Sequence, residues 1–160
     1  MRLAVVGPPG VGKSTSMERY RTYAMGCAGT QPLPALVEGT VGYGDACLVL
    51  FNVTDKSTFS HHAEAWLETA TQFTPHVVLV ATHMDVVDAD PGRRQVPYAD
   101  AANLAFRYGV MYIETAVTIL GSAKAPYDAV LALASRSPCR SLFPTPSSAV
   151  PPPEHKCVLQ

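Results

Sequence analysis

The chain has 160 residues, of which 48% are hydrophobic and 16% charged, a composition typical of one globular domain that can bury a core. Its net charge of -1 offers no basic surface for nucleic acid, so we set nucleic-acid binding aside. No apolar run reaches the roughly 18 residues of a membrane span, no signal-peptide pattern is present, and the four cysteines lack metal-ligand spacing. These features favour a cytosolic protein without disulfides.

Residues 7–14 read GPPGVGKS and match the phosphate-binding pattern G-x-x-x-x-G-K-[ST]. A strand-like run over 3–6 precedes the motif and a helix is expected over 14–24, which is the context that the motif requires. Glycines let backbone N–H groups point at phosphate oxygens, and the helix dipole adds positive potential there. The expected nucleotide contacts are Gly7, Gly10, Val11, Gly12, Lys13, Ser14 and Thr15. Lys13 is the expected catalytic residue, reaching the β- and γ-phosphates, and Ser14 the expected Mg²⁺ ligand.

Strands and helices alternate along the rest of the chain. Apolar runs predict buried strands over 45–52, 76–82 and 110–114. Helices are expected over 57–73, 98–108 and 127–134, the last with Pro126 near its first turn. The Gly- and Pro-rich stretch 26–44 is interpreted as a loop, although residues 35–37 hint at a strand. The alternation predicts an α/β fold, a mostly parallel sheet with helices on both faces and ligands at the carboxyl ends of its strands.

In this order the residues resemble a Ras-superfamily small GTPase, nearest to the Ras and Rab branches, over most of residues 1–134. Besides the phosphate loop, the resemblance rests on residues 43–59, which read YGDACLVLFNVTDKSTF, and on residues 93–109. It implies the fold of a P-loop NTPase, GTP and GDP as ligands together with Mg²⁺, and GTP hydrolase activity. It also implies a monomer that acts in signalling or trafficking.

The guanine-recognition motif of that family, [NT]-K-x-D, corresponds here to residues 82–85, THMD. The resemblance makes Thr82, His83 and Asp85 base contacts. The Asp85 carboxylate can accept two hydrogen bonds from guanine that adenine cannot donate, which disfavours an adenine-using P-loop kinase. His83 replaces the family's lysine, so we expect weaker nucleotide binding. The alternative interpretation of Asp85 is an ordinary carboxylate in a loop.

A second base contact in the family is a turn after the last strand, which corresponds to residues 114–118, ETAVT. The backbone N–H of Val117 is expected to reach the guanine carbonyl there, because every residue except proline has one, and Ala116 is an expected contact beside it. Residues 122–124 repeat the family's letters SAK, but they fall where the last helix is expected to begin. We interpret that repeat as coincidence.

The stretch 26–44 is much shorter than its counterpart in the family and has no D-x-x-G motif with a following Gln. Glu38 and Thr40 are candidates to replace part of the metal site. Slow hydrolysis and impaired switching are expected, because the family uses these segments for both. The family holds two strands in this stretch. If both are absent here, the first strand of the sheet would also become an exposed apolar edge. The chain is then either a truncated or alternatively spliced GTPase, or a diverged, switchless pseudo-GTPase that binds nucleotide or a partner without cycling.

Residues 135–160 are Pro-rich and are expected to form a flexible tail after the domain over 1–134. The tail ends in CVLQ, a C-a-a-X box of the kind that directs farnesylation of its cysteine, here Cys157, by a prenyltransferase. The expected location is the cytoplasmic face of the plasma membrane or an endomembrane. A single prenyl chain anchors a protein only marginally, so a second signal is expected, and palmitoylation of Cys139 is the candidate.

Overall fold

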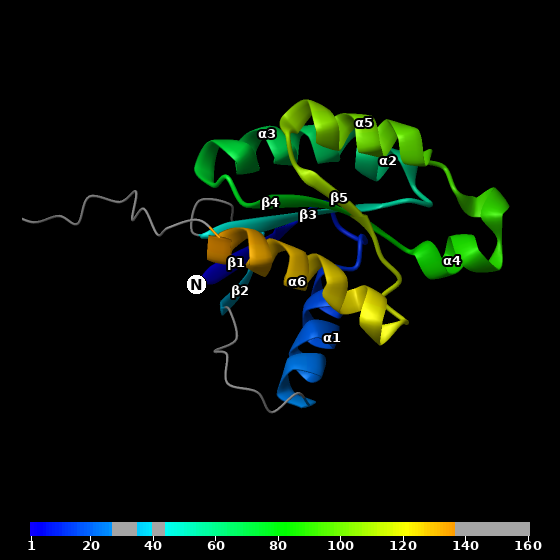
Figure 1. Ribbon diagram of the computed structural model, residues 1–160. Coiled ribbons are helices and arrows are strands. Elements are labelled where there is room, and N and C mark those ends of the chain that lie inside the picture. Colours follow the sequence, from blue (N-terminus) through cyan, green and yellow to red (C-terminus); the bar gives the residue numbers. More distant parts are fainter. Residues whose placement is uncertain (27–34, 40–43, 137–160) are drawn as a thin grey trace, which may run out of the picture.

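The computed structural model describes residues 1–26, 35–39 and 44–136 of the chain. Within these residues a five-stranded sheet lies between two layers of helices, and every neighbouring pair of its strands is parallel (Figure 1). The strands are β1 (Arg2–Val6), β2 (Ala35–Glu38), β3 (Ala46–Asn52), β4 (Val77–Thr82) and β5 (Met111–Glu114), in the order β2-β1-β3-β4-β5. The predicted α/β fold is confirmed.

Helical segments follow β1, β3, β4 and β5 along the chain. They are α1 (Lys13–Gly26), α2 (Lys56–Thr58), η2 (Phe59–Ala63), α3 (Glu64–Phe73), α4 (Met84–Ala89), η3 (Pro91–Arg93), α5 (Tyr98–Tyr108) and α6 (Leu120–Arg136). Helix α5 has the same bounds as the helix predicted over 98–108. The helix predicted over 57–73 is a continuous run from α2 to α3 with a π-helical turn, η2, inside it. Helix α6 begins earlier than predicted, because Pro126 is accommodated inside it rather than near its first turn.

The sheet is covered on both faces because its central strands are apolar along nearly their whole length. On one face, side chains of α3 and α5 such as Leu67 and Leu104 pack against β3 and β4. Helices α1 and α6 lie on the other face (Figure 1), where side chains such as Met17 and Val130 pack against β1, β3 and β4. The carboxyl ends of the strands are therefore the edge at which functional groups can gather.

Helices α1 and α6 are joined by aromatic rings. Tyr20 and Tyr127 stack with ring centroids 4.2 Å apart and planes 7° from parallel, and the hydroxyl oxygens of Ser16 and Tyr127 lie 2.9 Å apart. Tyr127 is fully buried, and this burial raises its pKa to about 12. The contact fixes α6, and with it the turn that leads into α6, against the helix that begins at the phosphate loop.

Strand β2 lies inside the stretch that the sequence indicated to be a loop, so that interpretation is wrong for residues 35–38. The strand pairs in parallel with β1, from Arg2 opposite Ala35 to Val5 opposite Glu38, and Gly39 N–H donates to Val5 O at 3.0 Å. The ladder offered by β1 stabilises a short strand whose flanking glycines and prolines argue against it, since strand formation depends on tertiary pairing. Because β1 has neighbours on both sides, the expected exposed apolar edge at β1 is also wrong.

Helices in the described part of the chain are all too short or too polar to cross a bilayer. Thr40, Cys139, Cys157 and the tail beyond Arg136 lie outside the described residues.

Candidate functional site

The loop between β1 and α1 has a backbone that requires glycine. Gly7, Gly10 and Gly12 have φ angles of +148°, +81° and +85°. Lys13 Nζ donates a hydrogen bond to Pro8 O at 2.9 Å, so the lysine side chain folds back over the loop. Helix α1 begins at Lys13 and has no acidic side chain in its first turn. The free N–H groups and positive dipole of this helix end can therefore face an anion held by the loop.

Gly7 is also held by steric contact with the neighbouring strand. A Cβ atom at Gly7 would lie only 2.4 Å from Leu50 O, whereas one at Gly10 would meet nothing within 4 Å. We expect Gly7→Ala to lower the free energy of unfolding by about 2–4 kcal/mol, since it adds a clash with backbone to an unfavourable φ. The matched variant Gly10→Ala carries the φ penalty alone and should lose about 1–2 kcal/mol. Urea unfolding measures both, and equal losses would contradict the steric role of Gly7.

The first turn of α1 meets the carboxyl end of β2. Ser14 Oγ donates to Glu38 Oε2 at 3.2 Å, and Lys13 Nζ lies 3.9 Å from Glu38 Oε1. A hydroxyl and a carboxylate are oxygen ligands of the kind that Mg²⁺ prefers, and Mg²⁺ commonly uses only one or two protein groups together with phosphate oxygens. Groups of three or more His, Cys, Asp or Glu that could hold a metal are absent from the described residues. The donor set thus fits a Mg²⁺ ion that is bound jointly with phosphates.

Thr82 links the phosphate loop to the strand ends. It is fully buried, and its Oγ1 lies 2.9 Å from Val11 O and 3.0 Å from Phe51 O. His83 Nδ1 lies 2.9 Å from the same oxygen. A hydroxyl has a single proton to donate, so when Thr82 donates to a carbonyl the histidine contact requires a proton on Nδ1; this assigns the tautomer from the network. The loop and the end of β4 are therefore held in a fixed relation.

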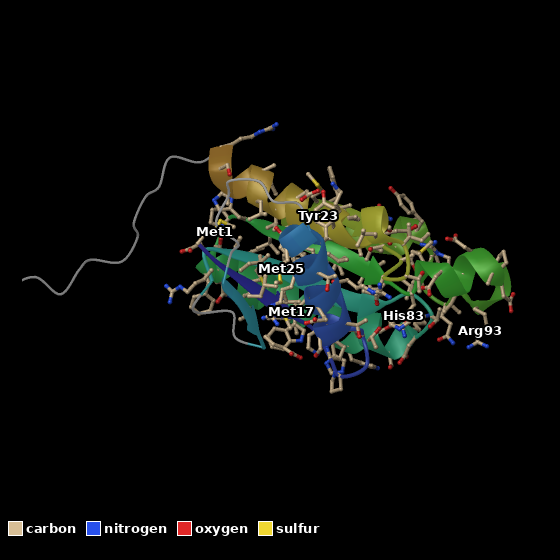
Figure 2. The ribbon with its side chains drawn as sticks, turned by 90° about the horizontal axis from the view of Figure 1, so that it is seen from below. Met1, Met17, Tyr23, Met25, His83 and Arg93 are labelled. Atoms are coloured by element: carbon tan, nitrogen blue, oxygen red, sulfur yellow. The ribbon has the colours of Figure 1, made fainter. Side chains whose placement is uncertain are left out.

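His83 and Asp85 follow Thr82 directly. His83 has a φ angle of +66°, the only positive φ of a non-glycine residue in the described chain, and its Cε1 approaches the Cβ position of Gly12 at 3.8 Å. Seen from below, His83 lies between α1 and the segment that carries Arg93 (Figure 2). Asp85 is half-buried in the first turn of α4. The imidazole therefore lies beside the phosphate loop, and the Asp85 carboxylate follows at the same edge of the sheet.

The turn after β5 is bound to this segment. Met84 N–H donates to Thr115 O at 3.3 Å, and Thr115 N–H donates to Ala81 O at 2.8 Å. Ala116 N–H is occupied within the protein, because it donates to Ser122 Oγ at 2.9 Å. The structure thus places the turn of Ala116 and Val117 next to the Thr82–Asp85 segment, and Val117 N–H stays the expected donor to a ligand.

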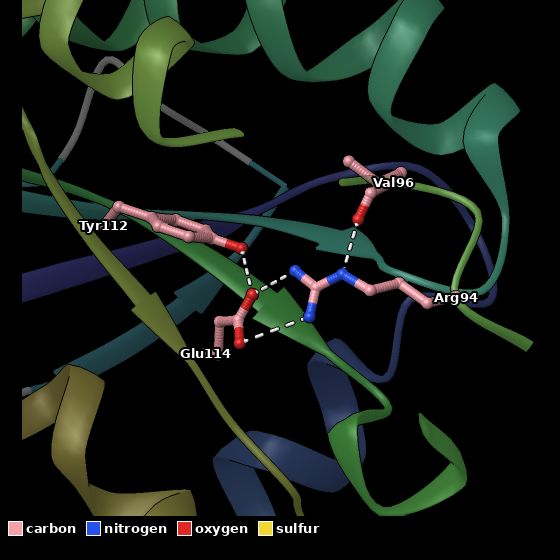
Figure 3. A network of polar contacts seen from close by, with 4 residues as sticks. All are labelled: Arg94, Val96, Tyr112 and Glu114. Atoms are coloured by element: carbon pink, nitrogen blue, oxygen red, sulfur yellow. Dashed lines mark hydrogen bonds and ion pairs between the residues drawn. The ribbon is translucent and has the colours of Figure 1, made fainter. Parts of the chain in front are cut away.

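Sequence reasoning did not find a second polar network, which holds the end of β5. Arg94 pairs with both carboxylate oxygens of Glu114, Arg94 Nε donates to Val96 O at 2.8 Å, and Tyr112 OH donates to Glu114 Oε1 at 2.7 Å (Figure 3). The hydrogen bond to Glu114 raises the pKa of Arg94, and burial raises the pKa of Tyr112. The signal in the sequence was Glu114, an acid at the end of a predicted buried strand, because such an acid needs a partner. The network fixes the strand from which the Thr115 turn departs.

A protein-family model described as "Ras: Ras family" matches residues 23–131. The match spans more than half of the chain and includes the segments at Thr82–Asp85 and Glu114–Val117. It begins after the phosphate loop, so the loop is supported by its own residues and geometry. No curated protein matches the chain.

Proposed function

The chain belongs to the Ras family of small GTPases, and from that premise we propose a monomeric protein that binds GTP and GDP with Mg²⁺, hydrolyses GTP slowly and acts at a membrane in signalling or trafficking. The observation that carries the nucleotide part is the 2.9 Å contact between Thr82 Oγ1 and Val11 O. It holds a guanine-type recognition segment beside a loop built for phosphates.

Each part of the nucleotide has a place in this arrangement. Lys13 Nζ donates to Pro8 O within the loop. When phosphates are bound there, it would donate to their oxygens in place of that carbonyl. Ser14 would hold Mg²⁺, with Glu38 as its neighbouring carboxylate, and the ion would neutralise phosphate charge when bound. Asp85 would accept from N1 and N2 of guanine, and Val117 N–H would donate to its carbonyl.

Slow hydrolysis is proposed because residues 26–44 hold no D-x-x-G motif with the Gln that orients the attacking water in this family. The same feature supports the alternative function, a switchless pseudo-GTPase or truncated isoform that binds nucleotide or a partner without cycling. A pseudo-GTPase that binds nucleotide differs from the GTPase in turnover, and one that binds only a partner also differs in nucleotide binding.

Purified protein incubated with labelled GTP or ATP in the presence of Mg²⁺ tests the proposal. GTP should bind at micromolar concentration and ATP at least roughly a hundredfold more weakly, because adenine cannot satisfy Asp85. Failure to bind GTP would overturn the nucleotide function. Single-turnover assays then separate the alternatives, since bound GTP that is never cleaved supports the pseudo-GTPase.

We further propose that a prenyltransferase modifies Cys157 and that the lipid holds the protein on the cytoplasmic face of a membrane. Cys157→Ser should move the protein from the membrane fraction to the soluble fraction, with Cys139→Ser reporting the contribution of a second lipid. The proposal requires that Gln160 be the last residue before processing, which intact-mass measurement reports. If Cys157→Ser divides between the membrane and soluble fractions as the wild type does, lipid anchoring through Cys157 is contradicted.

A further inference from the structure

We infer that Ser122 is a positioning residue for guanine: it holds the Thr115–Val117 turn so that Val117 N–H, and not Ala116 N–H, meets the 6-carbonyl of the base. The inference rests on the proposed nucleotide function and adds to it a residue from α6, outside the motif segments. Residues 122–124, whose letters were interpreted as coincidence, thus receive a role through the position of Ser122.

The first contact is made by the side chain. Ala116 N–H donates to Ser122 Oγ at 2.9 Å, and Ala116 is almost fully buried. A buried N–H needs a partner, and without the hydroxyl it would turn toward another acceptor. Because Ser122 satisfies this donor inside the protein, the next N–H along the turn, that of Val117, is the one left to the ligand.

The second contact is made by the backbone of Ser122. Thr115 Oγ1 donates to Ser122 O at 2.8 Å, and Thr115 is also buried. In a regular helix this carbonyl accepts a hydrogen bond from the N–H four residues later, but that residue is Pro126, which has none. The proline inside α6 therefore leaves a carbonyl for the Thr115 hydroxyl, and a feature that weakens the helix creates a binding point for the turn.

These contacts act at one side of the base and leave the other side to Asp85. The turn is bound to α6 through Ser122, to β4 through Ala81 O and to α4 through Met84 N–H. Loss of the Ser122 hydroxyl removes the hydrogen bond from Ala116 N–H, while the hydrogen bond from Thr115 Oγ1 to Ser122 O and the other two attachments remain. The effect should therefore be confined to the donor that meets the 6-carbonyl, with recognition by Asp85 retained.

Nucleotide analogues separate this positioning role from a structural one. The 6-thio analogue of GDP keeps the N1–H and N2 groups that face Asp85 but replaces the 6-oxygen by sulfur, a larger and weaker acceptor. The inosine analogue, IDP, keeps the 6-oxygen and lacks the N2 amino group. The ratio of Kd values for 6-thio-GDP and GDP reports the Val117 donor, and the ratio for IDP and GDP reports Asp85.

The experiment measures both ratios in the full chain, in Ser122→Ala, in Ser122→Thr, which keeps a hydroxyl, and in Ser135→Ala as a control on the same helix. Ser122→Ala should raise the Kd for GDP about tenfold, in line with one hydrogen bond, and bring the 6-thio-GDP ratio toward one with the IDP ratio unchanged. Ser122→Thr should restore the 6-thio-GDP ratio, and Ser135→Ala should change neither.

One result would overturn the inference alone, an unchanged 6-thio-GDP ratio in a Ser122→Ala variant that binds GDP. If GDP, 6-thio-GDP and IDP are weakened equally, the unchanged ratios indicate a structural role only. A wild-type chain that binds no GDP would overturn the proposed function, and this inference with it.

Discussion

Replacing Asp85 with asparagine is expected to change the base preference of the site from guanine toward xanthine. A carboxylate accepts from both N1–H and the N2 amino group of guanine, whereas an asparagine amide offers one acceptor and places an N–H₂ donor against the other. Xanthine carries an oxygen in place of that amino group and matches the amide. Losing one hydrogen bond and the charge on the acceptor of the other, with a donor placed against the N2 amino group, should raise the Kd for GDP by roughly 10²–10⁴-fold.

Competition between GDP and xanthosine diphosphate for the purified variant measures this change. The control is Asp88→Asn, which removes the same charge from the exposed side of the same helix, α4, and should leave both affinities unchanged. Should Asp85→Asn bind GDP as the wild type does, Asp85 would be an ordinary carboxylate near the loop, and the choice of guanine would need another residue.

Replacing Lys13 with alanine is expected to raise the Kd for GTP by about a hundredfold or more. Hydrogen bonds between an ammonium group and phosphate oxygens contribute about 1.5–3 kcal/mol each, and the lysine can serve the β- and γ-phosphates together. In the protein its ammonium group contacts Pro8 O at 2.9 Å and Glu38 at 3.9 Å, and Glu38 is 45% exposed, so loss of these contacts should cost little stability. Any hydrolysis that the wild type shows should fall with binding of the γ-phosphate.

Comparison of GTP with guanosine distinguishes a phosphate contact from a general loss of structure. Lys13→Ala should weaken GTP binding and leave guanosine binding unchanged, and thermal unfolding without nucleotide should match the wild type. Lys56→Ala, which removes an exposed lysine next to the Asp55 turn, is the control for net charge. Equal weakening of GTP and guanosine would assign Lys13 to the structure of the loop and not to the phosphates.

Features that depend only on residues adjacent along the chain could be predicted from the sequence. The phosphate loop and the buried strands follow from local patterns, because a glycine-rich turn between a strand and a helix, or a continuous apolar run, has few other structures available. Residues 35–37 only hinted at strand β2, since the ladder of β1 stabilises the strand and its own composition does not. The contact between Arg94 and Glu114 joins a loop to a strand end that only the folded chain brings together.

The role of Ser122 was missed in the sequence for a different reason. Its role depends on where α6 begins, and the position of Pro126 suggested a later start than the structure has. Once the helix begins at Leu120, Ser122 lies in its first turn with both a hydroxyl and a carbonyl directed at the preceding turn. Helix boundaries are the part of a structure that sequence patterns locate least well, so roles that depend on a cap or a first turn are the ones most easily missed.

Under the proposed function, the contact between Thr82 and Val11 would make the nucleotide a bivalent ligand. A buried hydroxyl holds the Thr82–Asp85 segment at a fixed distance from the phosphate loop, so a nucleotide bound at one of them would present its other half at high effective concentration. Guanosine and pyrophosphate, added separately, should each bind far more weakly than GDP. Each should also bind in the absence of the other. Loosening this single link would lower the affinity for the joined molecule and spare that for its two pieces.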